Sequence, residues 1–422
     1  MTQLKGRPSA GQRGEVTSGV RQGSLRRANL RLLLSLAYAA ASPLSRADLA
    51  GLSGLTRSTA SRLVDELVGA GLLTEGEPSR TASPGRPATP LLPGEAALAA
   101  VGIEVSTSYV AVRLIGLSGT VLGERHRFAD LVDSDPAEVF ALAGDLTAGL
   151  REEFGAGSSL RLLGAGLALP GLVDRGTGTL LTAPNLVWPQ AGPDHPLDPA
   201  PLLGPALADL PLQVGNEADL AALAVAHDRP GHLGEHRDFL FVSADVGIGG
   251  SIVTGGEPLT GRHGWAGELG HICIDPNGPR CRCGATGCLE RYAGRDVVFD
   301  AAGRPDPMRL RQAGRALGIA IAGAVNLLDV PTVVIGGDLA EVLDELLPEL
   351  EPQLTQRVLA ASVRPVRIVA APADRLAATG AAYRVLHHVL ADPSLLIDPR
   401  TSPGSALRRR SGRDRAEPPR RR

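Results

Sequence analysis

The sequence predicts an α/β protein in which a small α+β head precedes a larger body of two lobes. Near the N-terminus, apolar residues recur at helical spacing, and two short apolar runs around a polar loop follow them. Farther along, strand-like segments alternate with helical ones, and this order repeats. We therefore expect a head over residues 25–95 and a body over 96–395, between a basic disordered segment at 1–24 and an Arg-rich disordered tail at 396–422.

The composition fits a globular protein and excludes two kinds of chemistry. With 422 residues and 43% apolar content, the chain can bury cores in two or three folded units. It contains no apolar run of about 18 residues and no secretory signal, so we expect a cytoplasmic protein without a membrane partner. Lysine occurs only at Lys5, which excludes a Walker-type phosphate loop and a Schiff-base lysine in the folded part.

Positive charge gathers at both ends of the chain. The tail has two readings, a solvated disordered end or a non-specific contact with phosphates, and the sequence leaves both open. Its arginines are Arg408, Arg409, Arg410, Arg413, Arg415, Arg420, Arg421 and Arg422.

The head begins with two predicted helices. Leucine and alanine follow helical spacing over residues 29–41, which predicts the first helix. Ser45, with Asp48 three residues later, is typical of a capping box that starts a second helix over 46–52. Gly54 is placed to end that helix.

A third helix is expected from Thr56, as its N-cap, to about residue 70, with Gly71 ending it in a left-handed turn. One of its faces is apolar. The other carries hydroxyl and guanidinium groups that suit base edges and phosphates in a major groove, and no carboxylate before Asp65. The candidate DNA-contacting residues on it are Arg57, Ser58, Thr59, Ser61 and Arg62.

A two-stranded wing is predicted to follow, with strands over 72–75 and 89–92. Its loop contains Arg80 and Arg86, and Arg86 stands between Gly85 and Pro87 at a tip that suits a minor groove. Helix, turn, helix and wing together are typical of a winged helix-turn-helix domain that binds double-stranded DNA. A protein–protein interaction module is the alternative interpretation.

The body is expected to contain two α/β units around a cleft. Strands are predicted at 100–105, 109–115, 120–127 and 160–169, with a helix over 135–154, and then again at 239–242, near Ile252, at 332–335 and at 366–370. Later helices are expected over 308–328, 339–359 and a last segment that ends near Ala391. Ligands usually bind where loops leave strand ends at such a cleft.

The most specific chemical pattern is one imidazole and three thiols, His271, Cys281, Cys283 and Cys288, in a glycine-rich segment. A closed Cys₃His set leaves no position for an activated water, so we expect one structural zinc per chain rather than a catalytic metal. Disulfides are the alternative, which a reducing compartment disfavours. Cys273 is then expected to be a buried free thiol.

Around this cluster the sequence resembles the ROK family, named for its repressors, open reading frames and sugar kinases, from about residue 22 to 390. The resemblance implies an actin/hexokinase-like, ribonuclease-H-like body of two lobes. It rests on the segments Ala-Leu-Pro-Gly-Leu-Val-Asp at 168–174, Ala-Pro-Asn-Leu-Val-Trp at 183–188, Asn-Glu-Ala-Asp at 216–219, Asp-Val-Gly-Ile-Gly-Gly at 245–250, Ala-Gly-Glu-Leu-Gly-His at 266–271 and the cysteine cluster ending in Glu290.

The resemblance also implies which residues contact a sugar. Carboxylates and amides bind vicinal hydroxyls, and a metal fixes an imidazole so that its other nitrogen faces the sugar. Each carboxylate, taken singly, has the alternative of a solvated surface charge or a cap. The candidates are Asn185, Asn216, Glu217, Glu268, His271 and Glu290.

Two positions depart from the pattern of the family's kinases. The first loop, which in the kinases is Asp-x-Gly-Gly-Thr against the ATP phosphates, is here Glu-Val-Ser-Thr-Ser at 104–108, and the position of the catalytic aspartate holds Glu217. Phosphoryl transfer depends on positioning, so we expect no catalytic residue and loss of most of the rate, and residual kinase activity stays open.

These features predict a sugar-responsive transcriptional regulator of the xylose-operon-repressor type, a homodimer on palindromic DNA that represses carbohydrate genes. Activation instead of repression stays open. The first alternative is an active sugar kinase with an appended DNA-binding head. The second is a zinc-stabilised interaction module without a ligand.

Overall fold

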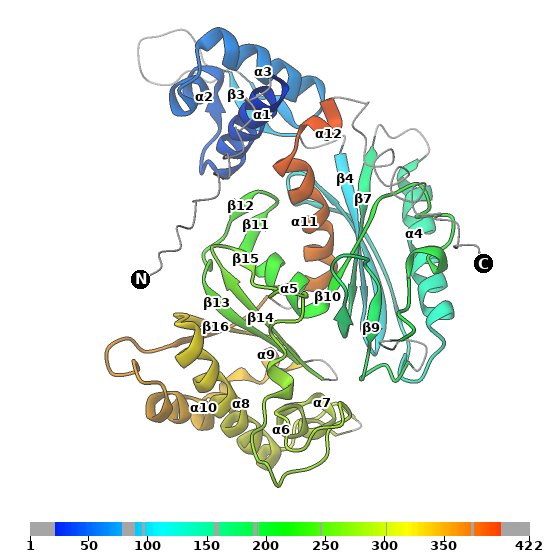
Figure 1. The fold of residues 1–422 in the computed structure, drawn as a ribbon, viewed down its shortest axis with the longest axis vertical. Helices are drawn as coiled ribbons and strands as arrows, with labels where there is room; N and C mark the ends of the chain where they lie inside the picture. The colour runs from blue at the N-terminus through cyan, green and yellow to red at the C-terminus, as the bar shows by residue number, and fades with distance from the viewer. Residues whose placement is uncertain are drawn as a thin grey trace, which may run out of the picture.

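The computed structural model describes residues 22–77, 89–94, 98–155, 160–188, 192, 194–244, 247–300, 302–372 and 375–397. They form a head and a body of two lobes, each lobe with its own sheet (Figure 1). No helix among these residues is long and apolar enough to cross a membrane.

The head contains three helices and a small antiparallel sheet with the order β1-β3-β2. The wing therefore has one strand more than the sequence predicted, because Leu44 and Ser45 pair with Leu91 and Pro90. The elements of the head are α1 (Gln22–Ala39), β1 (Leu44–Ser45), α2 (Arg46–Ser53), α3 (Arg57–Gly69), β2 (Leu73–Glu75) and β3 (Pro90–Pro93).

The predicted helix boundaries in the head are confirmed where side chains set them. The Ser45 hydroxyl accepts a hydrogen bond from the Asp48 amide at 3.2 Å, and the Asp48 carboxylate accepts one from the Ser45 amide at 2.9 Å, which completes the capping box. Gly54 and Gly71 have φ of 70° and 74°. α1 begins at Gln22, so residues 22–24 belong to a helix and not to the basic segment.

The first lobe is built on a five-stranded sheet with the order β10-β7-β4-β5-β6. The odd-numbered residues of β4 pack against α4, and Leu98, Ala100 and Gly102 face α11, so every residue of β4 is buried. The elements are β4 (Leu98–Val105), β5 (Tyr109–Gly116), β6 (Val121–Phe128), α4 (Pro136–Gly155), β7 (Arg161–Leu169) and β10 (Leu212–Asn216), with the hairpin β8 (Leu172–Val173) and β9 (Leu180–Thr182) at one end.

The second lobe repeats this arrangement with the order β15-β14-β13-β16-β17. In both sheets an antiparallel meander is followed by two strands parallel to its first strand, which confirms the predicted duplication. The elements are β13 (Phe239–Ala244), β14 (Ile248–Thr254), β15 (Glu257–Pro258), α6 (Glu290–Ala293), α7 (Arg295–Val298), α8 (Pro307–Leu328), β16 (Thr332–Gly337), α9 (Asp338–Glu341), α10 (Leu343–Arg357) and β17 (Arg367–Ala370).

The helix predicted over 339–359 is divided into α9 and α10. Val342, between them, has φ −114° and ψ 24°, outside helical geometry. α8 and α10 cover one face of the second sheet, whereas α5 (Glu217–Ala226) lies on the other face and between the lobes (Figure 1).

One apolar core joins the head to the body. It contains residues of α1 and α3, of β4 and β5, and of α11 (Leu376–Ala391). The short helix α12 (Ser394–Ile397) packs on it, so the folded part extends past residue 396, where the tail was expected to begin. The buried members include Leu30, Leu33, Leu34, Leu63, Leu67, Ala100, Ile115, Leu386, Val389 and Leu390.

α11 approaches its neighbours so closely that their backbones are in contact. A Cβ atom added to Gly102 of β4 would lie 1.8 Å from the Ala378 carbonyl oxygen. One added to Gly380 would lie 1.7 Å from the carbonyl oxygen of Leu220 in α5. Only glycine permits such approach, so α11 is fixed against the first sheet and against α5 together.

Gly380→Ala is expected to destabilise the protein by about 3 kcal/mol, because the added methyl group must displace the backbone of α5 or α11. Gly323→Ala is the matched control, since Gly323 also lies inside a helix but has no atom within 4 Å of its Cβ position. The control should gain about 0.5–1 kcal/mol. Urea midpoints of the purified proteins measure both, and equal midpoints for the two variants would contradict the close packing.

Candidate ligand pocket, metal centre and recognition helix

A pocket of about 420 Å³ lies between the two lobes. Its walls come from the first lobe at residues 170–185 and 216–217 and from the second lobe at 247–290. Its volume falls in the range of small-molecule sites. All six residues that the sequence predicted for sugar binding line it, namely Asn185, Asn216, Glu217, Glu268, His271 and Glu290.

Asn216 holds the wall of this pocket in place. Its Oδ1 accepts hydrogen bonds from the amides of Ala218 and Asp219, at 2.8 and 3.3 Å, and so caps α5. Its Nδ2 donates to the carbonyl oxygen of Gly171 at 3.0 Å. Both ends of the amide are therefore engaged within the protein, so Asn216 acts as a helix cap.

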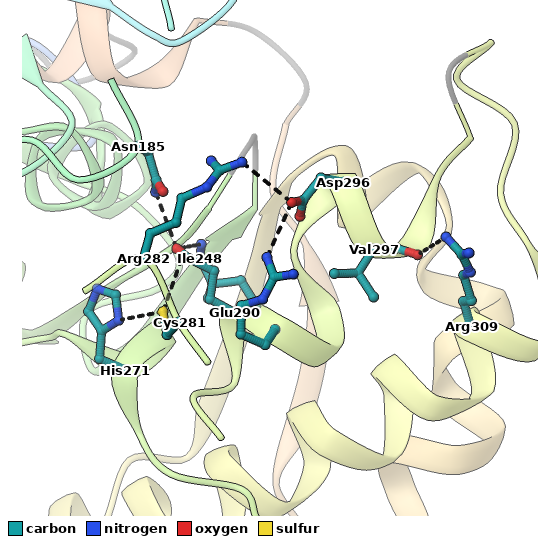
Figure 2. Close-up of polar contacts among 10 residues, drawn as sticks. Asn185, Ile248, His271, Cys281, Arg282, Glu290, Asp296, Val297 and Arg309 are labelled. Atoms are coloured by element: carbon teal, nitrogen blue, oxygen red, sulfur yellow. Dashed lines mark hydrogen bonds and ion pairs between the residues drawn. The ribbon is translucent and has the colours of Figure 1, made fainter. Parts of the chain in front are cut away.

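Glu290 connects the pocket to the cysteine cluster (Figure 2). Its Oε2 accepts hydrogen bonds from Asn185 Nδ2 and from the Ile248 amide, both at 3.2 Å. Its Oε1 lies 3.6 Å from Cys281 Sγ. The side chain is buried, so its position is fixed by these contacts.

The four residues predicted to bind zinc are brought together. The ligand atoms of His271, Cys281, Cys283 and Cys288 all lie within 4.8 Å of one another, and all the cysteines are free thiols. Cys283 Sγ and Cys288 Sγ are 3.8 Å apart. Four-coordinate zinc, with Zn–S bonds of about 2.3 Å, requires sulfurs about 3.8 Å apart, so the donor set fits the ion.

His271 lies between the metal donors and the pocket. Its Nδ1 is 3.9 Å from Cys281 Sγ, and its Nε2 is 3.9 Å from Glu268 Oε2. Desolvation raises the pKa of the Glu268 carboxyl; His271 partly opposes this shift, and the charges of Asp219 and Glu290 add to it. The Glu268 side chain nevertheless keeps 42% of its surface exposed, so a ligand can reach it.

Two features near the cluster differ from the sequence analysis. Cys273, expected to be a buried free thiol, is exposed. Arg282 was not among the candidates, yet it lines the pocket, with its guanidinium 3.7 Å from Asp296 (Figure 2). Its position between Cys281 and Cys283, two of the candidate metal donors, is the signal that would have identified it.

A second hollow of about 340 Å³ lies beside the loop that departs from the kinase pattern. The Glu104 carboxylate is buried there and accepts hydrogen bonds from the Ala378 amide at 2.9 Å and from the Tyr109 hydroxyl. Burial raises its pKa. The other charged residues of the lining are Glu124, Glu217, Asp338, Glu341 and Arg375.

The N-terminal turn of α3 presents the predicted DNA-contacting face. Arg57, Ser58 and Arg62 are exposed. Ser58 and Thr59 share hydrogen bonds with the N-cap Thr56, at 3.1 and 2.9 Å. Arg62 is paired with Glu66 at 2.8 Å, so it must leave that carboxylate to contact DNA.

Three further residues were predicted to contact DNA, one in α3 and two in the wing loop. Ser61 is half-buried, and its carbonyl accepts a hydrogen bond from Arg46 Nη1 at 3.0 Å. Arg80 and Arg86, the arginines of the wing loop, lie outside the described residues.

Comparisons with known proteins agree with this architecture. The ROK family profile matches residues 100–388. The xylose repressor of Caldicellulosiruptor bescii is 26% identical over 386 residues, which are 83% of this chain and 93% of the relative. The Escherichia coli "DNA-binding transcriptional dual regulator NagC" is 26% identical over 374 residues, 80% of this chain and 87% of the relative.

A solved structure extends the likeness to the whole architecture. The crystal structure of a ROK family transcriptional regulator, described as a homologue of E. coli MLC, has a TM-score of 0.71 and 25% identity, over 89% of this chain and 99% of that one. These relatives favour transcriptional regulation over sugar phosphorylation. Because the family profile spans most of the body, the chain belongs to the ROK family.

Proposed function

We propose that this protein is a DNA-binding transcriptional repressor whose affinity for its operator is controlled by a free sugar. The observation that carries the proposal is the pocket between the lobes, which gathers six residues from positions 185 to 290 beside a metal-donor cluster. The winged head supplies a DNA-reading element, and the relatives named as repressors support the regulatory role. Binding to palindromic operators would require a homodimer.

The pocket suits a monosaccharide. Neighbouring sugar hydroxyls can donate hydrogen bonds to the carboxylates of Glu268 and Glu290 and accept one from His271 Nε2. Several such hydrogen bonds together fix the orientation of a sugar ring. Asn185 is already held by Glu290, so it is positioned before a ligand arrives. A sugar therefore binds a pocket that is largely formed.

Zinc is proposed as a structural ion held by His271, Cys281, Cys283 and Cys288. When bound, it would supply four strong bonds that hold the segment from His271 to Cys288 in place. Three thiolates and the imidazole would fill its coordination, and the imidazole keeps Nε2 toward Glu268. The role of this centre is thus to hold two pocket residues, His271 and, through Cys281, Glu290.

The second hollow argues against phosphoryl transfer. Its carboxylates outnumber its one arginine, so it repels nucleotide phosphates. Glu104 also accepts a hydrogen bond from the Ala378 amide in the first turn of α11. Free amides at a helix N-terminus are what a bound anion would use, and this one is already engaged. The side chains of Ser106 and Thr107 fill the turn that follows, and both are buried.

The alternative is an active sugar kinase, and the rate of ATP-dependent sugar phosphorylation distinguishes it from a repressor. An assay that couples ADP release to a chromophore, with a panel of pentoses and hexoses, should show no rate above background. Turnover near one per second, the lower end for ordinary enzymes, would replace the regulatory proposal with the kinase.

A path for the sugar signal runs through packed helices. Asn216 and Glu217 lie at the pocket end of α5, and Leu220 in α5 touches Gly380 of α11. The far end of α11 lies in the core of the head. A change in the angle between the lobes on sugar binding would therefore shift α11 and the recognition helices.

Glu268→Gln is expected to abolish release of DNA by sugar, because it removes the charge that accepts a sugar hydroxyl while keeping the side-chain shape. Sugar affinity should fall at least about tenfold, and DNA affinity without sugar should not change. Fluorescence anisotropy with the gene's own upstream DNA and a sugar panel measures both. Glu345→Gln, an exposed change in α10, is the control; a normal sugar response of Glu268→Gln would remove Glu268 from the site.

Arg57→Ala should weaken operator binding about tenfold or more, because a direct base contact from arginine contributes about 1–3 kcal/mol. Arg311→Ala is the matched control, because it removes one exposed positive charge in α8, outside the head. Gel shifts at one fixed salt concentration compare the two. Equal affinity of both variants would contradict the assignment of α3 as the recognition helix.

A further inference from the structure

A second group of metal-binding side chains lies away from the sugar pocket, at the opposite end of α5. His227 follows the last residue of α5, His387 lies in α11, and Glu257 begins β15. One ligand atom from each lies within 4.8 Å of the others, and the two imidazole rings are 4.4 Å apart between centroids. These residues are 30 or more positions apart in the sequence, so only the fold brings them together.

The surroundings of both imidazoles disfavour their charged form. Burial lowers the pKa of His227, and burial together with His227 and Arg384 lowers that of His387 to about 3. Imidazoles beside a carboxylate are a donor set for divalent transition metals.

The hydrogen bonds of His227 suit a metal ligand. Its Nδ1 lies 3.1 Å from the carbonyl oxygen of Leu223, so this nitrogen carries the proton and Nε2 carries the lone pair. Metal-binding histidines usually donate their other N–H in this way. The ring is buried, which holds the lone pair in one direction.

The charges around the group are mixed. Arg384 lies near His387, and its positive charge disfavours a cation there. The negative charges of Asp219 and Glu257 offset the charge of the Arg384 guanidinium. Asp228 and His232 flank His227, and His232 Nδ1 is buried without a hydrogen-bond partner among the described residues. Glu257 is exposed, so an ion can enter from solvent.

We propose that His227, His387 and Glu257 form a second site for a divalent transition metal such as zinc, with water completing its coordination. The site joins the end of α5 to α11 and to the β14–β15 hairpin. It is separate from the cysteine centre, which lies at the pocket end of α5, a helix of 10 residues and so about 15 Å long. The proposal does not depend on the sugar or on DNA binding.

Metal binding at this site would alter a contact of the head. The Gly231 amide, in the turn between β11 (His227–Arg229) and β12 (His232–Leu233), donates to His387 Nε2 at 3.1 Å. A metal on Nε2 displaces this amide, and a metal on Nδ1 places a proton on Nε2 that faces it. Either way this hydrogen bond is lost from the turn whose Gly231 packs on Tyr38 of α1.

Zinc content distinguishes one site from two. The full untagged chain, reduced and dialysed against micromolar zinc, should hold two zinc ions, while His227→Gln and Glu257→Gln should hold one. Glu257 is exposed, so its variant keeps the fold, as circular dichroism can verify, and Glu345→Gln should retain both ions. One zinc in the wild type, or two in His227→Gln, would overturn the proposal.

Cobalt identifies which site each ion occupies. Cobalt bound to the cysteines gives a thiolate charge-transfer band, whereas cobalt on imidazoles and a carboxylate does not. When two equivalents of cobalt bind, the one at His227, His387 and Glu257 should therefore add only weak visible bands. These bands should be absent in Glu257→Gln. Hydrogen exchange at Gly231 should accelerate as that equivalent binds; unchanged exchange would contradict the loss of its bond to His387.

Discussion

The architecture depends on the contact of α11 with three other elements at backbone distance. Gly102 and Gly166 bring two strands of the first sheet against the carbonyls of Ala378 and Ala381, and Gly380 brings α11 against α5. No side chain lies between these backbones to absorb a displacement by changing rotamer. Movement of α5 relative to the first lobe must therefore carry α11 with it.

The two ends of α11 give this constraint its functional importance. Its first turn is held by Glu104 of the first lobe, and its last turns supply Leu386, Val389 and Leu390 to the core of the head. Head and body thus share one hydrophobic core. Arg27 and Asp392 add an ion pair at 3.7 Å, which contributes little because both side chains are partly exposed.

Local signals made much of the fold predictable. The capping box of Ser45 and Asp48 and the turns at Gly54 and Gly71 depend on neighbours within a few residues, and they lie where the sequence placed them. The six pocket residues were found through family motifs, since no periodicity relates them.

What the sequence missed depends on distant parts of the chain. The pairing of β1 with β3 joins residues more than 40 positions apart, and Cys273 is exposed although its neighbours are apolar. Asn216 could not be identified as a cap until its two hydrogen-bond partners were known. The group of His227, Glu257 and His387 arises only when α5, α11 and β15 meet.

Glu104 has a consequence for how such a protein can change during evolution. Its carboxylate accepts a hydrogen bond from the Ala378 amide of α11 and also lines the hollow beside that helix. A substitution that opened this space would also loosen the helix on which the head rests. The shape of the hollow and the anchoring of the head therefore cannot change independently at this residue.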